Sequence, residues 1–346
     1  MNAPSTVAGR VAVHARRLAW LAAFLLLAYS VLAGEPAGDP FAFFQPDVTL
    51  TVRDRARLDA GETVIRILPS RDGQLAVFGA TVLDAGPRSV AAWTRTLDHR
   101  FSDPPVLQDL DALVLDERDL DALRDCTPGN CRIKLAAPEI ASLKASGASA
   151  GGRSSDALQR WFREVVLGRV LYYRAGGISG IWPYVDRPVP MRPGDALGML
   201  VTGTSFLHLR AHAIADDLVS YPYVHASPRE SILYWSKEQI GGVAAVTVTH
   251  LRVYGPAGID PAPSVLIAGV EIYASHYRTG SLTVIGIVGS GATRETYLSY
   301  LNRSQVDTLR GPIGKLRRRP IERRVQRETV LAVRGLRQRL ERAGGK

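Results

Sequence analysis

Two histidines and an aspartate in the middle of the chain have the spacing of a metal site. His208, His212 and Asp216 follow one another at intervals of four residues, so a helix would place all three side chains on one face. Imidazole and carboxylate groups at such spacing can hold a transition metal. However, the glutamate that zinc proteases carry after the first histidine is missing, and leucines occupy the same segment. We therefore expect a polar helix edge and no metal.

A second group of polar residues falls in strand-like segments near the C-terminal end. Alternation along a strand places His250, Arg252 and Tyr254 on one face. A mostly apolar face with a few such groups is typical of a ligand pocket, although a solvated outer face or an ordinary aromatic core would explain the same pattern. We expect a pocket lined by Trp235, His250, Tyr254, Tyr273, His276 and Tyr300.

Motifs for covalent catalysis are missing from the sequence. Gly289-Ser290-Gly291 lacks the glycines that flank the serine of a nucleophile elbow at two positions on either side. The acidic residues between 109 and 121 alternate with leucines, which favours a solvated helix face over a pair of catalytic carboxylates. An enzyme would have to use His250 or His276 with a neighbouring tyrosine for acid–base chemistry.

The two cysteines of the chain, Cys126 and Cys131, lie on either side of Thr-Pro-Gly-Asn, a turn-forming sequence. In an oxidising compartment such a pair predicts a local disulfide. The loop is short, so the expected stabilisation is at most about 3 kcal/mol. A redox or metal pair is the alternative, but it would need CxxC spacing or a second pair of ligands nearby.

The N-terminus has the three parts of a secretory signal peptide in order. Arg10, Arg16 and Arg17 precede an uncharged apolar run over residues 18–33, which ends in Val31-Leu32-Ala33. The run is shorter than the ~20 residues of a typical membrane span. We expect cleavage after residue 33 and a periplasmic or secreted protein, with an uncleaved membrane anchor as the alternative.

The positive charge of the protein is concentrated at its C-terminal end. The chain carries a net charge of +10, and residues 310–346 contain thirteen Lys or Arg and three Glu. Apolar positions recur there at helical spacing, namely Ile321, Val325, Thr329, Val333, Leu336 and Leu340. Each basic residue close to an anionic membrane contributes about 1 kcal/mol of attraction. We expect this helix to bind an anionic membrane rather than nucleic acid, or else to be a solvated basic helix, and the expected contacts are Arg317, Arg318, Arg319, Arg323, Arg324 and Arg327.

The order of elements predicts an α+β protein. Residues 34–57 are expected to form a leader, and residues 101–230 a mostly helical insertion that includes a flexible loop at 144–155. Helices are expected at 87–97, 158–173, 206–218, 230–239 and after 314, and strands at 62–68, 74–83, 244–254, 264–277, 281–288 and 296–302. The last four strands are separated by turns, which predicts an antiparallel meander.

This order resembles the START-like (SRPBCC) superfamily and its helix-grip fold. The local likeness is the strand that ends in Leu83-Asp84-Ala85-Gly86-Pro87, followed by a helix with Val90 and Trp93; Gly86 stands where the family commonly has a proline. Four strands, a Gly-Pro-x-Gly break at 311–314 and a terminal helix complete the likeness. It implies a single domain over residues 58–346, in which a curved antiparallel sheet grips the C-terminal helix around an elongated apolar cavity.

The resemblance implies binding or transfer of a lipid or other hydrophobic small molecule at a membrane surface, with no cofactor. Two alternatives stay open because the family's fold carries several functions. One is an enzyme of the cyclase or hydrolase type that uses His and Tyr side chains. The other is an interaction protein with a filled core.

Overall fold

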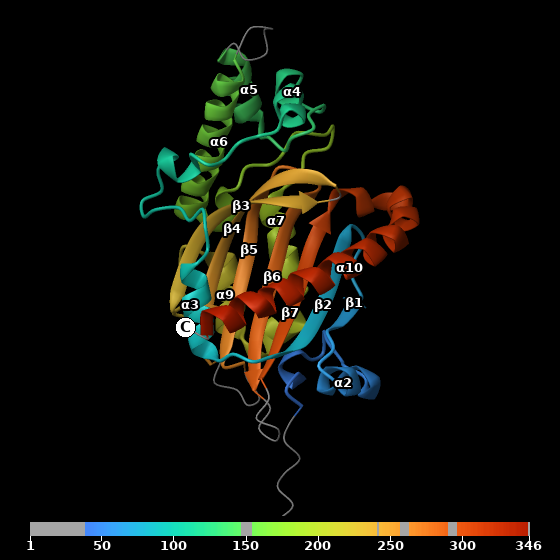
Figure 1. Cartoon of the computed structure of the whole chain (residues 1–346). Helices are drawn as coiled ribbons and strands as arrows, with labels where there is room; N and C mark the ends of the chain where they lie inside the picture. Colours follow the sequence, from blue (N-terminus) through green and yellow to red (C-terminus); the bar gives the residue numbers. More distant parts are fainter. Residues whose placement is uncertain (1–38, 147–153, 241, 257–262, 290–295, 345–346) are drawn as a thin grey trace, which may run out of the picture.

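A seven-stranded antiparallel sheet is the centre of the fold (Figure 1). The computed structural model describes residues 39–344, except 147–153, 241, 257–262 and 290–295; the predicted signal peptide and cleavage site lie outside this range. The spatial order is β1-β2-β7-β6-β5-β4-β3. The strands are β1 (Val64–Leu68), β2 (Gln74–Leu83), β3 (Glu230–Ile240), β4 (Val243–Tyr254), β5 (Val265–Ala274), β6 (Arg278–Gly289) and β7 (Thr296–Val306). The predicted meander of the last four strands is confirmed.

The prediction of a helix at 230–239 is wrong, because this segment forms the edge strand β3. It pairs with β4 over its whole length, from Glu230 opposite Val253 to Ile240 opposite Val243. Its polar residues at the tip, such as Lys237, are exposed, as is common for the edge of a sheet. The sequence at this tip lacks a strict apolar alternation, so its pattern does not indicate a strand.

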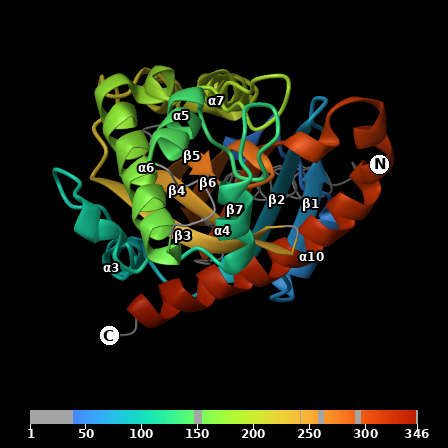
Figure 2. The ribbon, with the colours of Figure 1, turned by 90° about the horizontal axis from the view of Figure 1, so that it is seen from above.

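Helices cover both faces of the sheet (Figure 2). One face carries elements from the central part of the chain, which are η2 (Leu107–Leu110), α4 (Glu117–Arg124), α5 (Ala137–Ala145), α6 (Ser155–Gly176), η3 (Gly177–Gly180), α7 (Pro193–Thr202), α8 (Ser205–Arg210) and α9 (His212–Ser220). The other face carries α3 (Pro87–Arg95) and the long helix α10 (Gly311–Gly344), which the short turn η4 (Asp307–Leu309) joins to β7. The expected α+β class, with a curved antiparallel sheet and a long C-terminal helix, is therefore present.

The segment expected to be a leader is partly a built-in piece of the domain. Phe43 and Phe44 lie in the short helix η1 (Ala42–Phe44), and together with Phe41 they are buried in the main core. Helix α2 (Val52–Asp59) begins with a capping box in which the Thr51 side chain accepts from the backbone of Asp54. The domain therefore begins before residue 58, because these aromatic rings fill the core.

Helix α10 crosses the sheet diagonally and ends beside α3 (Figure 1). Four of the six predicted inner positions are buried (Thr329, Val333, Leu336 and Leu340), and Ile321 and Val325 are half-buried. The helix bends near its N-terminal end, where Pro320 lies inside it and cannot donate a helical hydrogen bond. The predicted stripe is thus confirmed, and its contact with the sheet is tightest in the C-terminal half of α10.

Candidate functional site

His250 lies in a hydrogen-bond network on the face of the sheet that packs against α6. Its Nδ1 is 2.8 Å from the Tyr173 hydroxyl, and its Nε2 is 2.7 Å from Oγ of Ser231. Burial, together with the positive charge of Arg252, lowers the pKa of His250 well below its ordinary value. The imidazole is therefore neutral near pH 7, and both of its nitrogens have partners.

The neighbouring residues of β4 continue this network toward α9. Arg252 donates to Oδ2 of Asp217 at 2.7 Å, and the Tyr254 hydroxyl donates to the same oxygen at 2.6 Å. The guanidinium of Arg252 also lies 4.7 Å from the centre of the Tyr221 ring. Tyr254 and Nη1 of Arg252 thus attach α9 to the sheet, while Nε and Nη2 of Arg252 lie against His250.

Tyr273 lies on the same face, farther up β5, against a buried arginine. The guanidinium of Arg169 lies between the rings of Tyr273 and Tyr184, at 4.5 and 5.0 Å from their centres, and forms an ion pair with Glu139. Burial raises the pKa of Tyr273 well above its ordinary value. This arrangement fills the space around Tyr273 with protein atoms.

Trp235 and His276 also contact the segments that precede β3. Trp235 stacks on His99, with ring centres 4.1 Å apart, and its Nε1 donates to the Asp109 carbonyl at 2.9 Å. His276 Nε2 is 3.0 Å from Oδ1 of Asp119 in α4. Five of the six predicted pocket residues therefore connect the sheet to the elements packed on it, and they lie apart from Tyr300.

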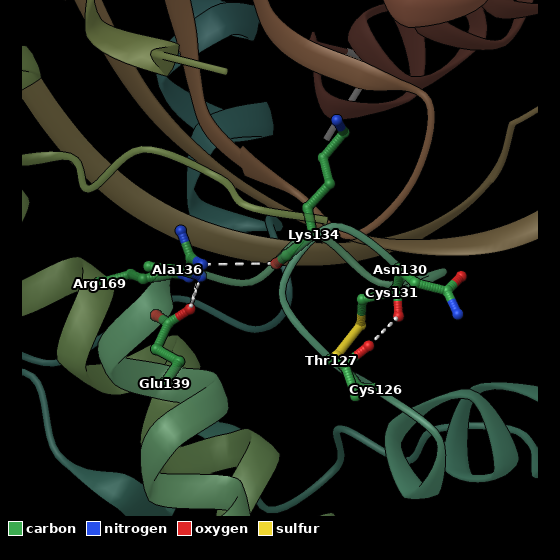
Figure 3. Close-up of a disulfide and its surroundings, with 8 residues drawn as sticks. All are labelled: Cys126, Thr127, Asn130, Cys131, Lys134, Ala136, Glu139 and Arg169. Carbon is green, nitrogen blue, oxygen red and sulfur yellow. Dashed lines mark hydrogen bonds and ion pairs between the residues drawn. A yellow bond between two sulfur atoms is a disulfide. The ribbon is translucent and has the colours of Figure 1, made fainter. Parts of the chain in front are cut away.

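The predicted disulfide between Cys126 and Cys131 is confirmed (Figure 3). It closes the turn after α4, where Thr127 and Asn130 pair through their backbones. The chain then reaches Lys134, which is 2 % exposed and whose Nζ is 2.6 Å from Oδ2 of Asp307. The disulfide is consistent with an oxidising, exported compartment.

In the part of the chain described, no helix is both long and apolar enough to cross a bilayer.

Tyr300 alone among the predicted pocket residues faces α10, and it belongs to a polar area of the sheet. Along β6 and β7 this face changes from apolar residues at one end, such as Ile287 paired with Leu298, to polar ones at the other, such as Thr283 paired with Asn302. The apolar end packs against α3 and the C-terminal half of α10. We call the polar end the polar floor, and define it as Tyr234, Glu238, Thr249, Glu271, Arg278, Thr283, Tyr300 and Asn302.

A charged group occupies the middle of the polar floor. Glu271 on β5 forms an ion pair with Arg278 on β6, and Arg278 also reaches Oε2 of Glu238 on β3 at 2.9 Å. Glu271 is only 5 % exposed, and burial raises its pKa to about 7 against the opposing effect of Arg278. Its Oε1 atom and Nε of Arg278 are buried, and neither has a hydrogen-bond partner among the described residues.

Two tyrosines flank this group. Tyr234 hydrogen-bonds Thr249, Tyr300 hydrogen-bonds Thr283, and burial raises the pKa of each phenol to about 12. Both side chains nevertheless keep part of their surface exposed, as do most other residues of the polar floor. The floor is therefore less completely covered than the packed face on the other side of the sheet.

The tip of the β3–β4 hairpin, at one end of the polar floor, lies close to the first half of α10. A side chain placed at Gly242, in the hairpin turn, would begin 3.9 Å from Nη2 of Arg324. The inner residues of this half of α10, Ile321 and Val325, are apolar and half-buried. The helix therefore has an apolar inner side near the polar floor.

The six arginines predicted to bind membranes have different surroundings. Arg318 holds α10 to the β1–β2 turn through Oγ of Ser70 and the Gln74 carbonyl, and Arg324 pairs with Glu328. The other four, Arg317, Arg319, Arg323 and Arg327, are exposed without an ion pair to any described residue. Large apolar side chains lie among them on the outside of the helix, including Ile313 (62 % exposed), Leu316 (82 %) and Leu331 (70 %).

Surface cavities of about 360 to 420 Å³ occur at three places: against α5 and α6 beside Trp161 and Trp182, against α8 and α9 beside His212, and at the C-terminal end of α10 beside Ser89. None of these three lies between the sheet and α10.

His212 pairs with Asp216 at 2.7 Å, and the described residues contain no group of three or more His, Cys, Asp or Glu placed to hold a metal.

Sequence reasoning missed Glu271, Arg278 and Glu238. The signal for Glu271 is present in the sequence, because it is the single charged residue in the apolar strand Val265–Ala274, and a buried charge requires a reason. Arg278 and Glu238 come from two other strands, β6 and β3, so the group becomes visible only when the order of the strands in the sheet is known.

Comparisons with known proteins add no relative: no family model, curated protein or solved structure matches this chain.

Proposed function

We propose that this chain is an exported START-like protein that binds a hydrophobic or amphipathic small molecule between α10 and the sheet. The support is the arrangement itself: an antiparallel sheet is crossed by a long C-terminal helix, as the resemblance implies. The single observation that carries the proposal is the polar floor, a partly exposed polar area on the face of the sheet that α10 crosses.

The energetics of the polar floor favour a ligand with one polar and one apolar part. A buried polar atom without a hydrogen-bond partner costs about 1–3 kcal/mol, and Glu271 Oε1 and Arg278 Nε are both in that state. A polar group of the ligand would recover this free energy, while its apolar part would contact Ile321 and Val325 of α10. The ligand would enter between α10 and the hairpin tip.

The outer side of α10 supports a membrane as the place of action. It combines four unpaired arginines with exposed Ile313, Leu316 and Leu331. Basic residues attract anionic headgroups, and aliphatic side chains among them insert at the boundary of the acyl chains. Membrane docking would place the entrance of the site close to the source of a lipidic ligand.

An acid–base enzyme is the second candidate, and Glu271 is the observation that favours it. A carboxyl group with a pKa of about 7 can both give and take a proton at neutral pH. His250 and His276, the residues expected from the sequence, have their reactive nitrogens committed to Tyr173, Ser231 and Asp119. An enzyme on this fold would therefore use the polar floor.

Native mass spectrometry and lipid extraction of the exported protein test the binding proposal. We expect a co-purified small molecule in the wild type and its loss in Thr283→Phe, which places a ring on the polar floor. Thr202→Phe, at an exposed position of α7, is the matched control and should keep the ligand. Equal ligand content in the two variants would contradict the proposal.

A further inference from the structure

The charged group of the polar floor has an excess of negative charge. Two carboxylates, Glu238 and Glu271, share the single guanidinium of Arg278. These are the charged groups that act on Glu271; the other side chains around it are the phenols of Tyr234 and Tyr300 and neutral Thr and Asn. With both glutamates ionised, the group carries a net charge of −1 beneath α10.

The group has one acceptor and one donor without a hydrogen-bond partner among the described residues, Oε1 of Glu271 and Nε of Arg278. Oε2 of Glu271 binds Arg278, whereas the buried Oε1 has no partner among the residues that the structure describes. Nearby, the hydroxyl oxygens of Tyr234 and Tyr300 can accept further hydrogen bonds. A ligand group that donates several hydrogen bonds and carries a positive charge would satisfy both the charge and the acceptors.

Resting on the function proposed above, we propose that the polar floor binds the protonated amine of an amphiphilic ligand, with the ammonium group donating to Oε1 of Glu271. An ammonium group has three donors and no acceptor, so it would satisfy Oε1 of Glu271 and the tyrosine oxygens, while Nε of Arg278 would keep no partner among the described residues. An anionic headgroup fits poorly, because Arg278 already serves two carboxylates and a further negative charge would raise the net charge to −2 in a buried place.

The Glu271–ammonium pair makes binding depend on pH. The carboxylate must be ionised to pair with the ammonium, and its pKa is raised to about 7 by burial. Uptake of the amine from a solution below pH 7 therefore releases a proton from Glu271. Between about pH 8 and pH 5.5 the ionised fraction falls by about 30-fold, and the affinity is expected to fall by a similar factor.

Isothermal titration calorimetry with three amphiphiles of equal chain length tests the inference: decylammonium, decanol and decanoate, each below its micellar concentration. At about pH 8 we expect decylammonium to bind wild-type protein at least about ten-fold more tightly than the other two. A general surface attraction cannot produce this order, because the protein carries +10 overall and its arginines would favour decanoate.

Glu271→Gln keeps the size of the side chain and should remove the preference for decylammonium, while Glu62→Gln, on the surface, should retain it. Circular dichroism verifies that the variants are folded. The pH series uses the wild type alone and so does not depend on any variant. A wild type that binds decanol or decanoate as well as decylammonium would overturn the amine inference and leave the binding function standing. A wild type that binds none of the three would contradict both.

Discussion

The two faces of the sheet are covered in different ways. One face packs against the helical elements from the central part of the chain, and the large side chains packed there, such as Tyr173, Tyr184 and Tyr273, are buried completely. The other face is covered mainly by α3 and α10, with apolar packing at one end and the polar floor at the other. Buried polar atoms without partners occur on both faces, so these atoms alone do not distinguish them.

The difference lies in what surrounds the charged groups. Arg169, on the packed face, is enclosed by an aromatic ring on each side and pairs with Glu139, although its Nε and Nη1 have no hydrogen-bond partner among the described residues. Glu271, on the other face, has half-buried neighbours and an excess of negative charge. We infer that the packed face contributes stability, and that the α10 face keeps a site whose environment a ligand completes.

The largest expected effect on the free energy of unfolding comes from a substitution on the packed face. Arg169→Ala would leave the carboxylate of Glu139 buried without its partner, which should lower the free energy of unfolding by about 3–5 kcal/mol. Urea denaturation measures the change. Arg160→Ala, at an exposed position of the same helix, should change it by less than about 0.5 kcal/mol. Equal effects of the two substitutions would remove the distinction between the faces.

The second prediction compares the two halves of α10. Leu336 is 6 % exposed against the apolar end of the sheet, so Leu336→Ala should destabilise the protein by about 2–5 kcal/mol. Val325, in the first half of α10, is only half-buried, so Val325→Ala should cost less than about 1 kcal/mol. A cost for Val325→Ala as large as that for Leu336→Ala would mean that α10 is packed equally tightly along its length.

The third prediction concerns pH and Glu271. Its pKa is raised from 4.5 to about 7 in the folded protein, so its contribution to stability is complete below pH 4.5 and is lost as the pH rises through 7. The stability of the wild type relative to Glu271→Gln should therefore fall by on the order of 3 kcal/mol over this interval. Denaturation at a series of pH values measures it, and a flat difference would show that Glu271 titrates normally.

The smallest expected change in free energy is in membrane binding by the outer side of α10. Arg317→Glu, Arg319→Glu and Arg323→Glu should each weaken binding to anionic liposomes by on the order of 1 kcal/mol, or about five-fold, without loss of stability. Flotation with phosphatidylglycerol vesicles measures this binding. The matched controls are Arg53→Glu and Arg118→Glu, exposed at other places. Losses of the same size in the controls would point to net charge alone.

Alternation and helical spacing predicted the parts of the fold that depend on local pattern. The strands from β4 to β7 and the inner stripe of α10 follow from them. Alternation also placed His250 and Tyr254 on one face, but it does not reveal which element covers that face. The pairing of β4 with β5 also shifts register between Val248 and Thr249. This shift changes which residues of the two strands share a face of the sheet, and no sequence pattern predicts it.

The polar floor needs the order of the strands, which local patterns do not contain. Glu238 comes from the edge strand β3, Arg278 begins β6, and Tyr300 lies on β7. In the strand order β7-β6-β5-β4-β3 these residues lie on either side of Glu271 in β5. Membrane binding through the arginines of α10 stays a prediction, although Arg318 is used to hold the helix in place.

Photo-crosslinking tests the central claim most directly. An alkylammonium probe with a diazirine in its chain would be bound to the wild-type protein, irradiated and located by peptide mass spectrometry. The account predicts labels on the peptides that contain Tyr234, Tyr300 and Val325, and their loss in Glu271→Gln. Labels concentrated at the cavity of α5 and α6 beside Trp161 and Trp182, with the polar floor unlabelled, would contradict it.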